Sequence, residues 1–170
     1  MNRFLLAIIG LGIWIQAGCS APPVTRELAH FPLDGMEHVI ARSAVEVDLA
    51  VSTDGQGSLR VVTGEPTVVR LFEVGDVDLE QTRLSYQAKV RTESVEGQVY
   101  LEMWCHFPGQ GEFFSRALHA PLSGSNEWTT QTTDFLLREG QKPDLVRLNL
   151  VVDGKGTAWI DDVRLFGTPM

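Results

Sequence analysis

The sequence predicts an all-β domain, a sandwich of two antiparallel sheets, and three observations carry this prediction. Apolar and polar residues alternate along most of the chain after residue 30, which is the pattern of strands with one buried and one solvent-facing side. Short turn signals that contain glycine separate these stretches. Seven or eight strands in about 140 residues is the size of a two-layer antiparallel sandwich around one core.

The alternating stretches place the expected strands in chain order. These are Ser58–Val62, Thr67–Phe72, 84–91, 97–107, Trp128–Phe135, 145–152 and Thr157–Phe166. The expected turns are Asp54-Gly55, Glu96-Gly97, Pro108-Gly109, Ser123-Gly124 and Asp153-Gly154. Residues 76–81 are long enough for a single helical turn. Each strand has one apolar face, which fits two sheets packed on a shared core.

The strand at 97–107 has the sharpest division between its two faces. One face is wholly apolar and consists of Val99, Leu101, Met103, Cys105 and Phe107. Successive side chains of a strand point to opposite sides, so this face must be the buried one. Cys105 is therefore predicted to be a small buried hydrophobe rather than a reactive thiol.

Three stretches resemble a known family in their order and spacing. They are residues 54–61 (DGQGSLRV), 84–91 (LSYQAKVR) and 154–165 (GKGTAWIDDVRL). They are similar to the opening, middle and closing strands of the jelly-roll carbohydrate-binding modules of the galactose-binding-like superfamily, including CenC-like modules. The resemblance covers residues 31–167, and the closing Trp159-Ile160-Asp161-Asp162-Val163 is its most specific part. It implies a jelly-roll sandwich, a fold that also serves accessory and spacer roles.

The resemblance also implies a structural calcium ion. Many members of the family hold calcium with an acid of the closing strand and ligands from the start of the domain. Calcium takes six to eight oxygen ligands, including backbone carbonyls. On this chain the implied ligands are Asp161, with Asp162 as its alternative, Asp34, with Glu37 as its alternative, and groups around Asp54. The alternative is that these acids are solvated turn residues.

The polar face of strand 97–107 is the candidate binding surface. Tyr100, Glu102, Trp104 and His106 share this face, where small or charged residues are more usual. Flat sugar rings stack on aromatic side chains, and sugar hydroxyls bond to carboxylate, arginine and amide groups. Arg147 and Asn149 lie on the polar face of strand 145–152 and complete the predicted carbohydrate site. The alternative is that a loop with Phe113 and Phe114 covers the two aromatic residues.

No residue pattern indicates catalysis. A glycosidase needs two carboxyl groups facing each other across the sugar, whereas Asp161 and Asp162 are adjacent on one strand and are expected to point to opposite faces. The four histidines lack zinc-like spacing, and the chain shows neither a Gly-x-Ser-x-Gly elbow nor a phosphate loop. We therefore predict a non-catalytic module whose partner is a glycan. An envelope scaffold that docks on a protein, with no sugar site, is the competing interpretation.

The first eighteen residues have the composition of a secretory signal. Arg3 supplies one positive charge, and residues 4–15 are apolar or glycine. This run is shorter than the roughly 20 residues that span a bilayer, so residues 1–18 are predicted to be a signal peptide. An uncleaved anchor and an ordinary secretory signal remain alternatives to the lipoprotein signal described next.

The run ends in Ala17-Gly18-Cys19-Ser20, which resembles the lipobox of bacterial lipoproteins. Gln16 stands where that family usually has an aliphatic residue. The resemblance implies acylation of Cys19, which becomes the first residue, and a membrane anchor made by the lipid alone. Ser20, in place of Asp, implies the outer rather than the inner membrane.

The chain then divides into a lipidated linker at residues 19–30 and a domain at residues 31–167. The full chain has a net charge of −8 at pH 7, and the signal contains one basic residue and no acidic one. The remaining chain is thus one charge more negative. Such an acidic protein lacks the basic face that binds nucleic-acid phosphates or anionic lipid.

Overall fold

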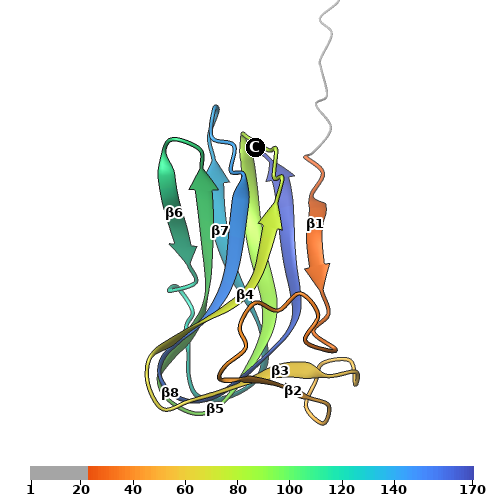
Figure 1. The fold of residues 1–170 in the computed structure, drawn as a ribbon, viewed down its shortest axis with the longest axis vertical. Coiled ribbons are helices and arrows are strands. Elements are labelled where there is room, and N and C mark those ends of the chain that lie inside the picture. Colours follow the sequence, from red (N-terminus) through yellow and green to blue (C-terminus); the bar gives the residue numbers. More distant parts are fainter. Residues whose placement is uncertain (1–22) are drawn as a thin grey trace, which may run out of the picture.

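The computed structural model describes residues 23–170, and these form eight strands (Figure 1). The strands are β1 Arg26–Phe31, β2 Val45–Asp48, β3 Ser58–Thr63, β4 Thr67–Gly75, β5 Thr82–Phe107, β6 Gly111–Arg116, β7 Leu122–Leu137 and β8 Leu145–Pro169. All strand pairs are antiparallel. The all-β class is therefore confirmed. The predicted signal peptide at residues 1–18 and Cys19 lie outside the described residues, and within residues 23–170 no helix could cross a membrane.

The two layers of the sandwich are two halves of one folded sheet. The long strands β5 and β8 pair with each other from Thr82 opposite Pro169 to His106 opposite Leu145. Both ribbons curl over together at the lower end of the molecule (Figure 1). The first half of β5 and the second half of β8 form one layer with β1, β3 and β7. The other halves form the second layer with β4 and β6.

Two glycines mark the crease where β5 and β8 fold over. Gly97 lies opposite Gly154, and their φ angles are 118° and 148°. A Cβ atom at Gly154 would lie 2.0 Å from the carbonyl oxygen of Glu96, and one at Gly97 would lie 2.1 Å from that of Asp153. The predicted turns at Glu96-Gly97 and Asp153-Gly154 are therefore wrong. These glycines bend continuous strands, because only glycine allows the two backbones to approach this closely.

The core fills the space between the layers, as the alternation predicted. Leu84, Tyr86, Ala88 and Val90 of β5 are buried, and so are Val99, Leu101, Met103, Cys105 and Phe107 farther along the same strand. The buried face moves from even to odd residues because the β5–β8 register shifts between Glu93 and Glu96. Cys105 is fully buried, as predicted, and burial raises the pKa of its thiol to about 12.

Several elements differ from the sequence-based expectation, among them β2 at Val45–Asp48, where no strand was expected. β1 begins at Arg26, within the stretch expected as a linker, and pairs with the end of β8, so the ordered domain starts before residue 31. β6 lies in a segment for which no strand was expected, because Phe113 and Phe114 interrupt its alternation. Residues 76–81 contain no helical turn.

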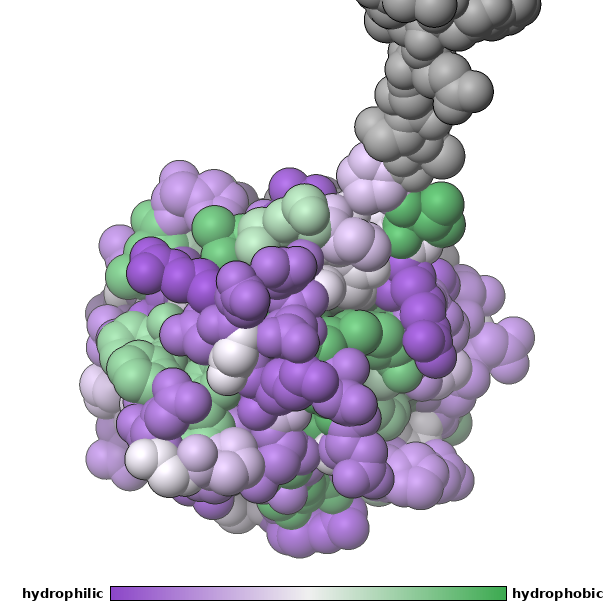
Figure 2. All heavy atoms as spheres, turned by 90° about the horizontal axis from the view of Figure 1, so that it is seen from above, coloured by the Kyte–Doolittle hydropathy of each residue, from purple (hydrophilic) through white to green (hydrophobic). Residues whose placement is uncertain are grey.

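The end of the sandwich where the chain enters at residue 23 is largely hydrophilic. Figure 2 shows this end from above, with hydrophobic residues in separate patches among hydrophilic ones. Such scattering is ordinary for a surface that faces water. It gives no reason to place a large apolar contact at this end.

Tyr86 offers a direct test of the packing of the core. Its ring is fully buried, and its hydroxyl has no hydrogen-bond partner among the described residues. Leaving such a group buried costs about 1–3 kcal/mol, so Tyr86→Phe is expected to leave the free energy of unfolding unchanged or raise it by up to about 1 kcal/mol. Urea unfolding measures this change. A loss of stability above about 1 kcal/mol would show that the hydroxyl is bonded.

Candidate functional site: a cleft across four strands

Two rows of side chains cross the outer face of the second layer, from β4 through β8 and β5 to β6. The first row is Arg70, Asn149, Glu102 and Arg116, and the second is Glu73, Arg147, Trp104 and Phe114. Neighbours within a row are paired in the strand register, which brings their Cβ atoms to about 5 Å. This face is opposite to the buried one, as the alternation in 97–107 predicted.

A cleft of about 390 Å³ opens on this face. Its lining consists of Val68, Arg70, Glu102, Trp104, Glu112, Arg116, Arg147 and Asn149, and we refer to it as the Trp104 cleft. Four of the six residues predicted for carbohydrate binding therefore share one hollow: Glu102, Trp104, Arg147 and Asn149. Clefts of this size with a few convergent polar groups are typical of ligand sites.

Glu102 is a buried carboxylate within the cleft lining, with only 2% of its surface exposed. Arg116 donates from Nε to one carboxylate oxygen at 2.7 Å, and Asn149 donates from Nδ2 to the other at 3.1 Å. Burial raises the pKa of Glu102, but hydrogen bonds from Trp104, Arg116 and Asn149 outweigh burial, and the pKa lies below its usual value. Glu102 is therefore a fixed anion with a fixed orientation at neutral pH.

Asn149 is held by the same contact. Its amide group is committed to Glu102, and its side chain is only 5% exposed. The carbonyl oxygen Oδ1 has no hydrogen-bond partner among the described residues. A buried acceptor without a partner is uncommon, because it forfeits a hydrogen bond. Asn149 lines the cleft, so this buried and unsatisfied acceptor lies next to the space that a ligand would occupy.

The aromatic part of the cleft comes from two strands. Trp104 of β5 is partly exposed, and its ring centroid lies 4.9 Å from that of Phe114 on β6. Phe114 is half exposed, and the guanidinium of Arg116 lies 4.5 Å from the centroid of its ring. The segment with Phe113 and Phe114 therefore does not cover Trp104 as a loop. It lies beside Trp104 as strand β6 and extends the aromatic surface.

Two predicted residues are placed differently. Tyr100 points to the expected side of β5 but is only 6% exposed, and it does not line the cleft. His106 also lies outside the cleft, where its Nδ1 bonds to the carboxylate of Asp144. Alternation identifies the face of a strand but not what covers each position, so these two residues are removed from the site. Phe114, Arg116, Arg70 and Glu112 join it.

The three predicted calcium ligands are engaged separately. Asp161 is buried, and its Oδ2 accepts hydrogen bonds from the amide and hydroxyl of Thr53 at 2.8 and 2.6 Å. Asp54 is exposed and accepts a bond from the amide of Gln56, and Asp34 is also exposed. Among residues 23–170 no three acidic, histidine or cysteine side chains are close enough to hold a metal. The predicted ligands are therefore not gathered into one site in this arrangement, and the calcium ion stays a prediction.

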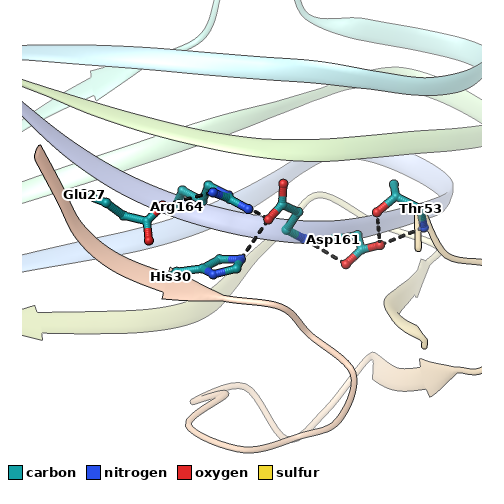
Figure 3. Close-up of polar contacts among 6 residues, drawn as sticks. Glu27, His30, Thr53, Asp161 and Arg164 are labelled. Carbon is teal, nitrogen blue, oxygen red and sulfur yellow. Dashed lines mark hydrogen bonds and ion pairs between the residues drawn. The ribbon is translucent and has the colours of Figure 1, made fainter. Parts of the chain in front are cut away.

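Asp162 donates from its backbone amide to Oδ1 of Asp161 at 2.8 Å, but its side chain makes contacts of its own. Two residues of β8, Asp162 and Val163, stand opposite the single residue Ala88 of β5, and Asp162 has a φ of 50°. Its Oδ1 lies 2.8 Å from Nε2 of His30 and accepts a bond from Nε of Arg164 at 2.8 Å. Arg164 in turn reaches Glu27 of β1 at 3.0 Å. Figure 3 shows the contacts of His30 and Arg164 next to those of Asp161 with Thr53 along β8, joined by the hydrogen bond to Asp161.

The contacts of Asp162 with His30 and Arg164 predict that the free energy of unfolding falls in acid. Burial raises the pKa of Asp162, but the bonds from Arg164 and His30 outweigh burial and set the pKa below its ordinary value of 3.8. A lowered folded-state pKa gives stability that is present above about pH 4 and is lost as the pH falls through that pKa. Asp162→Asn, in which asparagine tolerates the positive φ, should flatten the decline. Urea unfolding at pH 6 and pH 3 compares the two proteins, and equal declines would show that Asp162 contributes nothing.

Comparison with known proteins identifies relatives by structure alone. No family model matches the chain, and no curated protein matches it. The CBM22-1 xylan-binding domain of Paenibacillus barcinonensis Xyn10C is similar, with a TM-score of 0.64 and 13% identity over 88% of this chain and 99% of that one. The CBM22-2 xylan-binding domain of the same protein has a TM-score of 0.52 and 14% identity over 84% and 99%.

A multidomain enzyme contains a similar module. The CBM22-1–GH10 modules of Clostridium thermocellum xylanase Xyn10B, solved with xylohexaose, have a TM-score of 0.58 and 12% identity. The match covers 85% of this chain and 28% of that one. At these identities the likeness shows the fold, which is that of β-sandwich carbohydrate-binding modules. The narrower CenC-like resemblance stays a prediction.

Proposed function

We propose that this chain is a non-catalytic carbohydrate-binding module that holds a polysaccharide in the Trp104 cleft. One observation carries the proposal: a partly exposed indole, a fixed buried carboxylate and an unpartnered buried amide oxygen line the same hollow. Aromatic faces and fixed hydrogen-bonding groups are what a sugar ring with hydroxyls requires. The fold shared with xylan-binding domains supports the same conclusion.

Each group in the cleft has a role in this proposal. Sugar rings stack on Trp104 and Phe114, which lie side by side. Sugar hydroxyls donate to Oδ1 of Asn149 and to Glu102, whose negative charge strengthens such bonds. Arg147 is held between Glu73 at 3.5 Å and Glu112 at 2.7 Å, so its guanidinium presents donors at a fixed place.

The proposed setting is the bacterial cell envelope. Acylation of Cys19 would tether the exported domain to a membrane, with the outer membrane favoured by Ser20. The acidic chain would contact the membrane through this lipid only, because its net charge of −8 disfavours anionic lipid. A polysaccharide bound in the cleft would thereby be held at the cell surface or in the periplasm.

Affinity electrophoresis tests the proposal. The protein is run through native gels that contain one soluble polysaccharide each. The neutral ones are xylan, mixed-linkage glucan, arabinan and galactan, and the acidic ones are glucuronoxylan and polygalacturonate. Retardation by at least one polymer, abolished by its free oligosaccharides, is the expected result. Unchanged mobility in neutral and acidic polymers alike would favour the scaffold interpretation.

A further inference from the structure

The arginines of the Trp104 cleft differ in whether a carboxylate already neutralises them. Arg116 is paired with Glu102 at 2.7 Å. Arg147 is paired with both Glu73 and Glu112. Arg70 lines the same cleft from β4, is exposed, and has no ion-pair partner among residues 23–170. Arg70 is therefore the one arginine of the cleft that no carboxylate of the described residues pairs, although Glu73, Glu102 and Glu112 together balance the charge of the three arginines.

The surroundings of Arg70 point to a ligand rather than to solvent alone. Arg70 stands opposite Asn149 in the strand register, and the Oδ1 atom of Asn149 is the buried acceptor without a partner. A guanidinium binds a carboxylate through two parallel hydrogen bonds, and the amide oxygen beside it accepts from a hydroxyl. A sugar acid presents both groups on one ring.

We propose that the Trp104 cleft prefers an acidic glycan and that Arg70 binds the carboxylate of a uronic acid residue. This inference rests on the proposed carbohydrate binding and adds the class of glycan. Glu102 does not oppose the uronate, because Arg116 and Asn149 neutralise and bond it. The rest of this acidic chain would repel a polyanion at low salt, so a preference for acidic polymers must come from a local cation.

Chemically matched polymers test this inference. The protein is titrated with glucuronoxylan and polygalacturonate, and with the same polymers after carboxyl reduction, which turns each uronic acid into its neutral sugar. At least one acidic polymer is expected to bind about tenfold more tightly than its reduced form. This is the affinity difference expected from one pair of charge-assisted hydrogen bonds. Arg70→Gln should reduce the ratio of the two affinities from about ten to about one.

Arg83→Gln is the matched control. Arg83 is exposed on β5, outside the cleft, and has no ion pair within the described part of the chain. Its replacement therefore changes the net charge of the protein by the same amount as Arg70→Gln. Equal affinity for acidic and reduced polymers, or an Arg70→Gln effect no larger than that of Arg83→Gln, overturns this inference while the carbohydrate-binding function stands. Binding to none of the acidic or neutral polymers overturns both.

Discussion

Gly154→Ala is expected to lower the free energy of unfolding by at least about 3 kcal/mol, which for a domain of this size lowers the melting temperature by about 6–12 °C. The added methyl carbon would lie 2.0 Å from the carbonyl oxygen of Glu96 and 3.0 Å from the Cα atom of Gly97. Neither backbone atom can move without opening the β5–β8 ladder. The φ of 148° at Gly154 is itself strained for any side chain.

Gly109→Ala separates crowding from backbone strain. Gly109 also has a positive φ, 73°, but an added methyl would meet no atom within 4 Å. Gly109→Ala should therefore lower the free energy of unfolding by only about 1–2 kcal/mol, which is the penalty for a side chain in the left-handed region. Thermal unfolding of the two variants compares these effects. Equal losses would mean that the crease between the layers is not closely packed at Gly97 and Gly154.

Trp104→Ala is expected to weaken glycan binding at least about 30-fold, the equivalent of about 2 kcal/mol for an aromatic residue at the centre of a binding site. Trp104 is partly exposed, so its removal should cost less stability than the 3–5 kcal/mol typical of a fully buried tryptophan. The two effects can therefore be separated. Affinity is measured by calorimetric titration, and stability by urea unfolding of the same samples.

Trp128→Ala is the control for this prediction. Trp128 is also partly exposed, but it lies on β7 and does not line the cleft. It should change stability to a similar extent and leave glycan affinity intact. A comparable loss of affinity in both variants would trace the Trp104 effect to general loosening of the sandwich.

Much of the cleft could be predicted from alternation in single strands. The period of two in 97–107 placed Glu102 and Trp104 on the face opposite the core, and the same rule placed Arg147 and Asn149. Which strands lie side by side depends on the long-range pairing of the sheet. The contributions of Arg70 on β4 and Arg116 on β6 therefore became visible only with the strand order.

The errors have similar physical origins. Gly97 and Gly154 look like turn residues in a local window, because a turn and a crease both require positive φ and close backbone approach. Tyr100 was expected to be open, because the period of a strand carries no information on what packs over a given position. The calcium ion stays a prediction, and in this structure Asp161 accepts hydrogen bonds from Thr53, which is far away in the sequence, and from the amide of Asp162.

The position of a bound glycan on the protein tests the central claim most directly. The ¹⁵N-labelled protein is titrated with hexasaccharides of the polymer that slows its migration most in affinity electrophoresis. The NMR signals of the Trp104 indole N–H and of the amides of residues 102–104, 114–116 and 147–149 are expected to shift. The signals of residues in the other layer, including Trp159, which lies between Arg60 and Arg91, should not shift. Shifts around Trp159 with an unmoved Trp104 signal would contradict the assignment of the Trp104 cleft as the binding site.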